Sequence, residues 1–195
     1  MSRSAGVAGA EAALAGRRRI LFVGCSGAGK STLARQLGAI LDLPVIHLDR
    51  HYWQPGWIPL DDDAWDRRLG ELLAEPAWIM DGNYHRTFPL RMRFADVVVF
   101  LDLPRRVCLA RVLRRIASGH GRTRDDLGPG CPEKWDGEFL RWVWHWKRDI
   151  RPQLLAALAR APAGLPVITL GTTRHISRFL DGARRIVGER AAGRS

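Results

Sequence analysis

A glycine-rich segment near the start of the chain has the residue types and spacing of a phosphate-binding loop. Residues 24–31, GCSGAGKS, match the pattern GxxxxGK[ST] at every position, after an apolar run and before a helical pattern. Glycines there let the backbone adopt positive φ angles and turn several N–H groups toward phosphate oxygens. The amino end of the following helix adds partial positive charge. The segment therefore predicts a site for the phosphates of a nucleoside triphosphate.

Two side chains of this loop carry the expected chemistry. Lys30 would place a full positive charge near the β- and γ-phosphates, and the Ser31 hydroxyl would ligate Mg²⁺. A glycine-rich turn with a chance lysine would lack the flanking strand and helix. The residues that we expect to contact the nucleotide are Gly24, Ser26, Gly27, Ala28, Gly29, Lys30, Ser31 and Thr32. The predicted cofactors are accordingly ATP and Mg²⁺, and Lys30 is also predicted to be catalytic.

Two aspartates are candidates for the carboxylate that orients the metal ion or its water shell. Asp81 follows the apolar run 77–80, and Asp102 follows the apolar run 97–101. Both fit the pattern of a buried strand that ends in an acid, so spacing alone does not choose between them. Either aspartate would serve equally as a simple cap at the end of its strand.

The segment after a further apolar run, residues 44–48, is the candidate acceptor site. Asp49 ends that run and precedes the aromatic sequence RHYWQPGW at 50–57. A carboxylate there would accept a hydrogen bond from a hydroxyl or act as a base, although a turn cap explains an aspartate equally well. Aromatic faces such as that of Trp53 would hold a flat acceptor, or they would fold over as a plug beneath a lid. We favour an acceptor pocket and assign Asp49 and Trp53 to it.

Arginines suited to a transferred phosphate gather in the second half of the chain. Phosphoryl transfer depends mainly on positioning and on stabilising spread negative charge. Arg111 and Arg115 are four residues apart and would share one helix face, and Arg122 follows in the glycine-flanked segment 119–130. The alternative is an ordinary solvated basic face. We assign the three arginines to catalysis, on a helical lid of about residues 111–151.

Apolar runs alternate with helical patterns along the chain. The runs expected to form strands are 20–23, 44–48, 77–80, 97–101 and 166–170. The segments expected to form helices are 30–41, 63–74, 104–118 and 133–150. The strand sequences are apolar throughout rather than alternating, which favours a sheet covered on both faces. Because helices separate the strands, the sheet should be parallel, and the predicted fold is a three-layer α/β domain.

Composition gives expectations for the two ends of the chain. Residues 1–16 are rich in alanine, glycine and serine and are expected to form a disordered leader; 188–195 are expected to form a flexible tail. Residues 17–187 would then make a single domain. No apolar run is long enough to cross a bilayer. The amino end also lacks the order of charges of an export signal, which predicts a cytoplasmic protein.

The chain is strongly basic, with 31 lysines and arginines against 20 acidic residues and a net charge of +11. Nearly all of the basic residues are arginine, which suits bidentate binding of phosphate. Positive charge also attracts nucleic acid, and a GC-rich genome would impose a similar composition. The charge therefore supports an anionic substrate only weakly. The three cysteines are widely separated, and this spacing supports neither a disulfide framework nor a zinc site.

Taken together, these motifs resemble those of the adenylate-kinase-like kinases. The likeness rests on the phosphate loop, on DGNYHRT at 81–87 and on LDLP at 101–104 followed by spaced arginines. With HLDRHYWQPGW at 47–57 and a tryptophan-rich helix near the C-terminus, the chain is more closely similar to bacterial topology modulation proteins, which are small P-loop kinases. The resemblance covers about residues 19–180.

The resemblance implies a five-stranded parallel sheet in the order 2-3-1-4-5, with the third strand beside the strand that leads into the phosphate loop. Asp81 would then face the metal, so it is preferred over Asp102 as the metal-linked and catalytic carboxylate. Arg86 lies one residue beyond the arginine that binds the acceptor's phosphate in adenylate kinases, and it is assigned to the acceptor site without implying AMP specificity. Similar kinases bring the arginines that correspond to Arg111 and Arg115 into the site.

The predicted function is an ATP- and Mg²⁺-dependent phosphotransferase that acts on a nucleotide, a nucleoside or a similar small acceptor. The alternative is a nucleic-acid-associated P-loop ATPase or regulator, which the basic charge would suit. The chain is short for a helicase-type motor, however, and it contains no helix-turn-helix or zinc module. A non-catalytic nucleotide switch would leave the arginine-rich lid unexplained. We expect a monomer or homodimer with no membrane partner, and nucleic acid is not the favoured partner.

Overall fold

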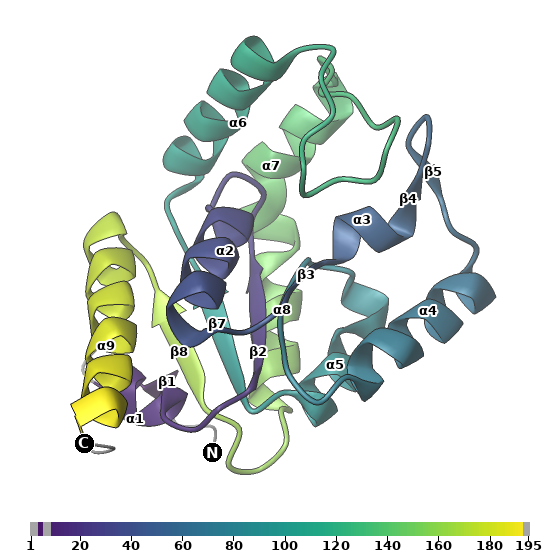
Figure 1. Ribbon diagram of the computed structural model, residues 1–195. Coiled ribbons are helices and arrows are strands. Elements are labelled where there is room, and N and C mark those ends of the chain that lie inside the picture. The colour runs from purple at the N-terminus through teal and green to yellow at the C-terminus, as the bar shows by residue number, and fades with distance from the viewer. Residues whose placement is uncertain (1–3, 6–8, 193–195) are drawn as a thin grey trace.

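The structure is a computed structural model, and it describes residues 4–5 and 9–192. Within these residues, six strands form one parallel sheet in the order β1-β8-β7-β2-β6-β3 (Figure 1). The strands are β1 (Ser4–Ala5), β2 (Arg19–Gly24), β3 (Val45–His47), β6 (Trp78–Asp81), β7 (Val97–Leu101) and β8 (Val167–Leu170). A separate hairpin pairs β4 (Trp53–Gln54) with β5 (Ile58–Pro59) in the antiparallel sense.

Helices cover both faces of the main sheet. They are α1 (Ala10–Leu14), α2 (Lys30–Leu41), α3 (Leu48–Tyr52), α4 (Asp62–Ala74), α5 (Phe88–Phe94), α6 (Arg105–Gly119), α7 (Gly137–Asp149), α8 (Arg151–Ala159) and α9 (Thr173–Ala192). In Figure 1, α2 and α9 lie in front of the strands and α8 lies behind them. On the far face, Phe100 of β7 contacts Trp146 of α7, with ring centroids 6.4 Å apart. The chain therefore has three layers.

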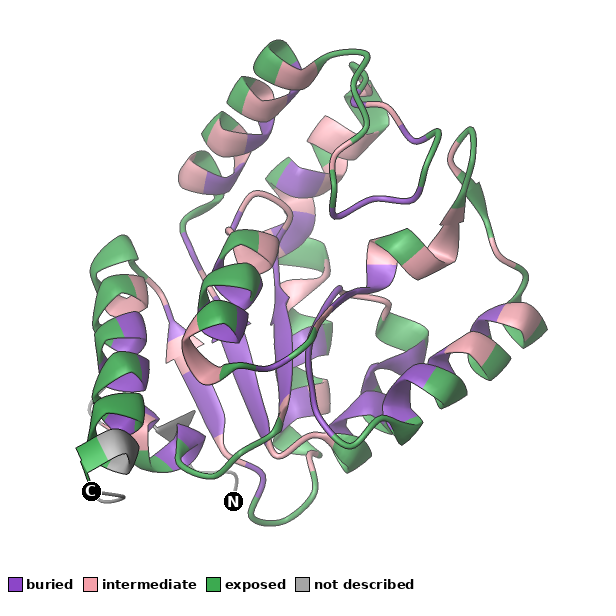
Figure 2. Ribbon diagram, viewed as in Figure 1, coloured by how far each residue is buried: buried purple, intermediate pink, exposed green. Residues whose placement is uncertain are grey.

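The central strands are buried along nearly their whole length. Every residue of β7 is buried, and Arg19 is the one residue of β2 that is not. Figure 2 shows the burial running along the strands, whereas the helices are buried on one side only. Since helices cover both faces of the sheet, neither side of a strand meets water. This explains why the strand sequences are apolar without alternation.

The predicted sheet is confirmed. The five predicted strands are β2, β3, β6, β7 and β8, and their observed order β3-β6-β2-β7-β8 is the expected 2-3-1-4-5. The additional strand β1 pairs with β8 at the edge. The helix expected over 133–150 begins later, at Gly137, because the Asp136 side chain caps it by accepting a hydrogen bond from the backbone N–H of Phe139.

The described parts of the two termini differ from the expectation of disorder. Within the expected leader 1–16, β1 joins the sheet and α1 packs against α9, with Ala10 and Leu14 buried. The tail expected from residue 188 continues α9 as far as Ala192. Alanines and a leucine at helical spacing give α1 a small apolar face, a signal that the overall composition obscures. The rest of both expected segments, 1–3, 6–8 and 193–195, lies outside the described residues.

None of the helices in the described part of the chain combines the length and the apolar character that crossing a bilayer requires.

Candidate active site

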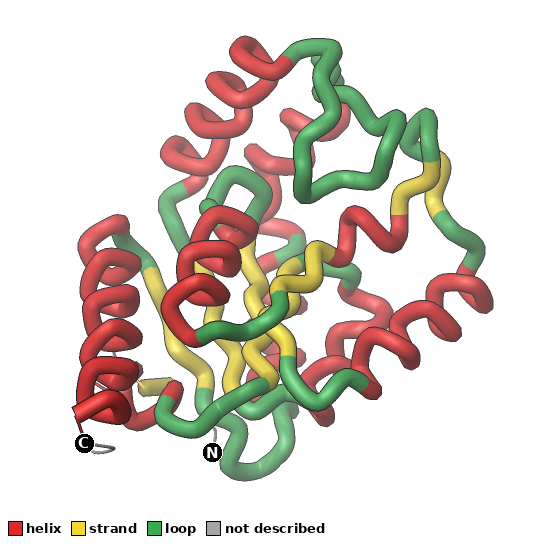
Figure 3. Tube along the Cα trace, in the orientation of Figure 1, coloured by secondary structure: helices red, strands yellow, loops and turns green. Residues whose placement is uncertain are grey.

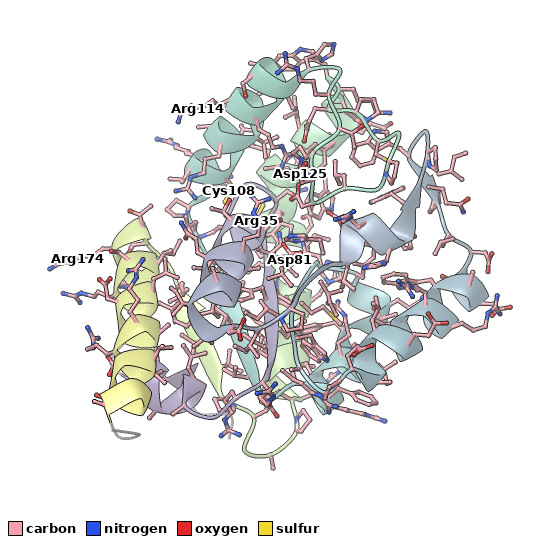
Figure 4. All side chains as sticks on the ribbon, viewed as in Figure 1. Arg35, Asp81, Cys108, Arg114, Asp125 and Arg174 are labelled. Carbon is pink, nitrogen blue, oxygen red and sulfur yellow. The ribbon has the colours of Figure 1, made fainter. Side chains whose placement is uncertain are left out.

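A cavity of about 900 Å³ opens at the carboxyl ends of the strands. The crossover from β2 leads to β3 on one side, and the later connection from β6 leads past β2 to β7 on the other. Ligands of open parallel sheets bind at such a switch point. The walls come from the phosphate loop, from the segment after β3, from α6 and from residues 120–136, here called the lid loop. In Figure 4, Arg35, Asp81 and Asp125 lie toward this central region, whereas Arg114 and Arg174 point outward.

The phosphate loop has the conformation that its glycines allow. Gly24 has φ +144°, and a Cβ atom there would lie 2.4 Å from the carbonyl oxygen of Leu101. Gly27 has φ +78°, and its Cβ would lie 2.3 Å from the carbonyl oxygen of Cys108 on α6. Gly29 adopts the left-handed conformation directly before α2. The loop is thus packed between β7 and the start of α6 in a way that any side chain at Gly24 or Gly27 would disrupt.

Most of the predicted nucleotide-contacting residues face the cavity. The members that line it are Ser26, Gly27, Gly29, Lys30, Ser31 and Thr32. Gly24 and Ala28 are buried beneath the loop and shape its path. The Lys30 Nζ atom donates hydrogen bonds to the carbonyl oxygens of Gly24 and Cys25, at 2.9 and 3.1 Å. These bonds hold the ammonium group against the loop that it is predicted to serve.

The two candidate carboxylates lie in different surroundings. Asp81 ends β6, lines the cavity and is 4% exposed, with its Oδ1 atom 2.9 Å from Nδ1 of His47. Asp102 follows β7 and is bound by Arg151, whose Nη2 atom lies 2.7 Å from its Oδ2 atom, and by Lys147 at 3.5 Å. Asp102 does not line the cavity. The geometry therefore separates two residues that spacing left equivalent.

Asp49 and Trp53 both line the cavity, as expected for an acceptor site. The Tyr84 hydroxyl donates a hydrogen bond of 2.6 Å to the Asp49 carboxylate. Burial raises the pKa of Asp49, and the hydrogen bond from Tyr84 lowers it in part. Trp53 packs edge-on against Tyr52, with ring centroids 5.0 Å apart. An aromatic wall and a carboxylate with a free oxygen thus face the same space.

Arg86 does not reach this cavity. Its guanidinium group makes two hydrogen bonds to the carboxylate of Asp66, at 2.9 and 2.8 Å, and a salt bridge to Asp62 at 3.1 Å, all on the exposed side of α4. The structure therefore places Arg86 away from the cavity that holds the other residues assigned to the acceptor. Its guanidinium group lies instead at the acidic start of α4.

The buried arginine of this region is Arg91, which the sequence reading missed. Arg91 is fully buried and donates to the carbonyl oxygens of Gly82 at 2.9 Å and Tyr84 at 3.0 Å, and also to that of Asn83. The Asn83 side chain in turn accepts a hydrogen bond from the backbone N–H of Gly24. Arg91 therefore braces the turn after β6 against the phosphate loop. The sequence feature that could have pointed to Arg91 is its position one turn into α5, shortly after the DGNY segment.

Two of the three predicted catalytic arginines line the cavity. The Nη1 atom of Arg111 donates to the carbonyl oxygen of Ala28 at 3.3 Å, and the Nε atom of Arg115 lies 2.9 Å from Oε1 of Glu133. Arg122 is exposed and does not line the cavity. Arg124 faces it instead, with its Nε atom 2.8 Å from Oε1 of Glu133. The lid loop turns back at Gly121, which leaves Arg122 on the outside.

Hydrogen bonds join the lid loop to the β4–β5 hairpin. The backbone N–H of Gly56 donates to the carbonyl oxygen of Gly130 at 2.8 Å, and the Trp57 indole N–H donates to that of Pro132 at 3.0 Å. A Cβ atom at Gly128 would lie 2.4 Å from the carbonyl oxygen of Trp53. Figure 3 shows the long loop between α6 and α7 reaching across toward this hairpin. The acceptor segment and the lid loop are therefore in direct contact.

Two carboxylates line the same cavity as Ser31 and offer oxygen ligands suited to Mg²⁺. Asp126 of the lid loop is buried and lines the cavity together with Asp81. Burial opposes the ionisation of Asp126, but Arg124 and a hydrogen bond from the Ser31 hydroxyl outweigh it and lower the pKa of Asp126. No group of three His, Cys, Asp or Glu side chains in the described chain could hold a metal alone. Hydroxyl and carboxylate oxygens fit Mg²⁺, which is usually completed by phosphate and water.

The comparisons with known proteins bear on the fold. A shikimate kinase from Acinetobacter baumannii, solved in complex with shikimate, has 20% identity and a TM-score of 0.53, and the match covers 94% of this chain and 98% of that one. A proposed kinase from Chloroflexus aurantiacus has 17% identity and a TM-score of 0.50, over 86% and 97%. This chain has the P-loop kinase fold. Identity this low shows a shared fold and leaves the substrate open.

No protein-family model matches the sequence, and neither does any curated protein. The closer resemblance to topology modulation proteins therefore stays a prediction.

Proposed function

We propose that this chain is an ATP- and Mg²⁺-dependent phosphotransferase that transfers the γ-phosphate to a small acceptor, a nucleotide, a nucleoside or a similar compound. The observation that carries the proposal is that both candidate sites line one cavity. Lys30 and Ser31 of the phosphate loop line it, and so do Asp49 and Trp53 from the segment after β3. Arg111 of α6 lies beside the loop. A donor and an acceptor held in this cavity would meet near the loop, and positioning is the main requirement of phosphoryl transfer.

In this proposal the side chains act by holding and orienting charge. Lys30 would exchange the carbonyl oxygens of Gly24 and Cys25 for phosphate oxygens. Arg111 and Arg115 would approach the transferred group from α6, where fixed positive charge stabilises the charge that spreads over its oxygens. Mg²⁺ held through Ser31 and Asp81 would neutralise part of the phosphate charge. The likeness of four sequence segments to topology modulation proteins supports the same class of reaction.

The test of the proposal is the variant Lys30→Ala. Removing a full charge from the phosphate site should lower ATP turnover by about 100-fold or more. Turnover is measured as ATP consumption in the presence of nucleosides, nucleoside monophosphates and small hydroxylated metabolites. Arg114→Ala is the matched control, because Arg114 lies on the outer side of α6 (Figure 4). Equal turnover in wild type and Lys30→Ala would refute the proposal. Hydrolysis that only DNA stimulates would favour a nucleic-acid-associated ATPase instead.

A further inference from the structure

Glu133 is a buried acid in the wall of the cavity, close to the end of the lid loop. It is 4% exposed and lines the cavity. Its backbone N–H donates to the carbonyl oxygen of Arg122, and its own carbonyl oxygen accepts from the N–H of Gly121, both at 2.9 Å. These bonds tie the two ends of the lid loop together, where the loop leaves α6 and returns to α7 (Figure 1). The Glu133 carboxylate is therefore held on a fixed piece of backbone.

One oxygen of this carboxylate meets guanidinium groups from two different elements. The Oε1 atom lies 2.9 Å from Nε of Arg115 on α6 and 2.8 Å from Nε of Arg124 on the lid loop. In the described residues none of these three atoms makes a hydrogen bond of good geometry. Attraction between opposite charges, rather than directed hydrogen bonding, therefore draws the two arginines to Glu133.

Without Glu133 the two guanidinium groups would repel each other. Burial lowers the pKa of Arg115, the charge of Arg124 lowers it further, and Glu133 partly offsets both by raising it. Arginine side chains have many rotamers, and fixing one in place costs conformational entropy. Like charges on two such side chains would separate into the open cavity. The carboxylate of Glu133 is thus what keeps both arginines at one point.

That point is linked to the phosphate loop from two sides. Arg111, one turn before Arg115 on α6, donates to the carbonyl oxygen of Ala28 in the loop at 3.3 Å. The Nη1 atom of Arg124 lies 3.3 Å from Oδ2 of Asp126, and Asp126 accepts a hydrogen bond from the Ser31 hydroxyl.

The cluster of Arg115, Arg124 and Glu133 also lines the same cavity as Lys30 and Ser31. In the part of the chain that the structure describes, the Nη atoms of Arg115 donate no hydrogen bond. They are donors that suit phosphate oxygens.

We propose that Glu133 is a positioning residue, which holds Arg115 and Arg124 together where they contact the γ-phosphate of bound ATP. Glu133 itself would not touch the nucleotide. The proposal rests on the proposed function and deepens it, because it names the residue that fixes the arginines at the transferred group. Fixed positive charge at that group is what stabilises the charge that develops during transfer. The competing possibility is that Glu133 occupies the place of the phosphate and weakens its binding.

The test compares the binding of ADP with that of a non-hydrolysable ATP analogue, because only the analogue carries a γ-phosphate. In the wild type the analogue should bind more tightly than ADP. Glu133→Gln keeps the shape of the side chain and removes its charge. It should weaken binding of the analogue by about tenfold and change the Kd of ADP by less than about threefold. Unchanged or tighter binding of the analogue would overturn the proposal, and so would loss of ADP binding, which would indicate a structural role.

A second comparison shows whether Glu133 acts through the arginines. In a chain that already carries Arg115→Ala and Arg124→Ala, adding Glu133→Gln should weaken the analogue by less than about twofold, because no arginine is left to position. This background also leaves no buried charge without its partner. A further tenfold loss there would overturn the proposal. Glu138→Gln is the matched control, because Glu138 is exposed and does not line the cavity, and both Kd values should equal those of the wild type.

Turnover gives an independent measurement. Glu133→Gln should lower kcat for ATP consumption by about 30-fold and raise the KM for ATP by a smaller factor, because the arginines matter most during transfer. A kcat equal to that of the wild type would contradict the proposal. If the wild type binds the analogue but phosphorylates none of the nucleosides, nucleoside monophosphates or hydroxylated metabolites, the proposed function fails. The two Kd values would still decide the role of Glu133.

Discussion

Asp81 and Asp102 end the two strands that flank β2, and they differ in the partners that the fold provides. Asp81 lines the cavity beside His47, whereas Asp102 is bound by Arg151 and Lys147. Asp81→Asn should therefore raise the Mg²⁺ concentration needed for half-maximal turnover by about tenfold or more. Asp102→Asn should leave that concentration unchanged and lower the free energy of unfolding by about 1 kcal/mol, because it weakens a partly exposed ion pair. The reverse ranking in a Mg²⁺ titration would contradict this assignment.

Asp49 gives the acceptor reaction a defined pH dependence. Burial raises the pKa of Asp49. The acidic limb of the pH profile of kcat/KM should therefore have an apparent pKa above the ordinary pKa of aspartate, and activity should fall as the pH drops through it. The contribution of Asp49 to the free energy of unfolding changes with pH in the opposite direction to activity. The folded state holds this proton more tightly than the unfolded state, so the contribution of Asp49 to stability is lost as the pH rises through its raised pKa.

Two variants test whether Asp49 is the group whose titration produces the acidic limb. Asp49→Asn should remove it from the pH profile of kcat/KM. Tyr84→Phe should move it to still higher pH, because the hydrogen bond from Tyr84 lowers the pKa of Asp49. A limb that stays in place in both variants would show that another group controls the profile.

At the scale of elements, the contact between the lid loop and the β4–β5 hairpin agrees with the alternative interpretation of the aromatic segment, a plug beneath a lid. Gly128 packs so closely on Trp53 that an added Cβ would lie 2.4 Å from a backbone oxygen. Gly128→Ala should therefore displace the lid loop, lower turnover by about tenfold or more and speed cleavage of the loop by protease. Gly137→Ala is the control, because nothing lies within 4 Å of its added Cβ and alanine favours the start of α7. Equal turnover and equal protection in the two variants would contradict a role for this contact.

The elements themselves could largely be predicted, because each depends on nearby residues. Non-alternating apolar runs identified β2, β3, β6, β7 and β8, and short-range caps such as Asp136 decide where helices begin. The helices α5, α8 and α9 were not predicted, and neither were the short elements at the amino end. β1 and α1 contain too few residues to show a period, and their stability comes from β8 and α9, which are distant in the sequence.

At the scale of the whole molecule, the sheet order follows from handedness and connection. Helices between strands favour parallel crossovers. The crossover from β2 leads to β3 on one side of it, and the connection from β6 leads to β7 on the other side. The cavity forms where they diverge, so the same topology that places the phosphate loop also places Asp49 and Asp81 around it. The position of the site is thus a property of the fold, and its selectivity is a property of the side chains.

The sequence by itself determined the donor end of the site. A phosphate loop is built from eight consecutive residues whose backbone conformation is set by glycine, so its function can be predicted locally. Tertiary structure alone decided which acids and arginines face the cavity. In the structure Arg86 forms an ion pair with Asp66, Arg115 forms one with Glu133, and Asp102 forms one with Arg151. Each of these pairs joins different elements, and an ionic side chain binds the opposite charge that the fold brings nearest, which no spacing along the chain reveals.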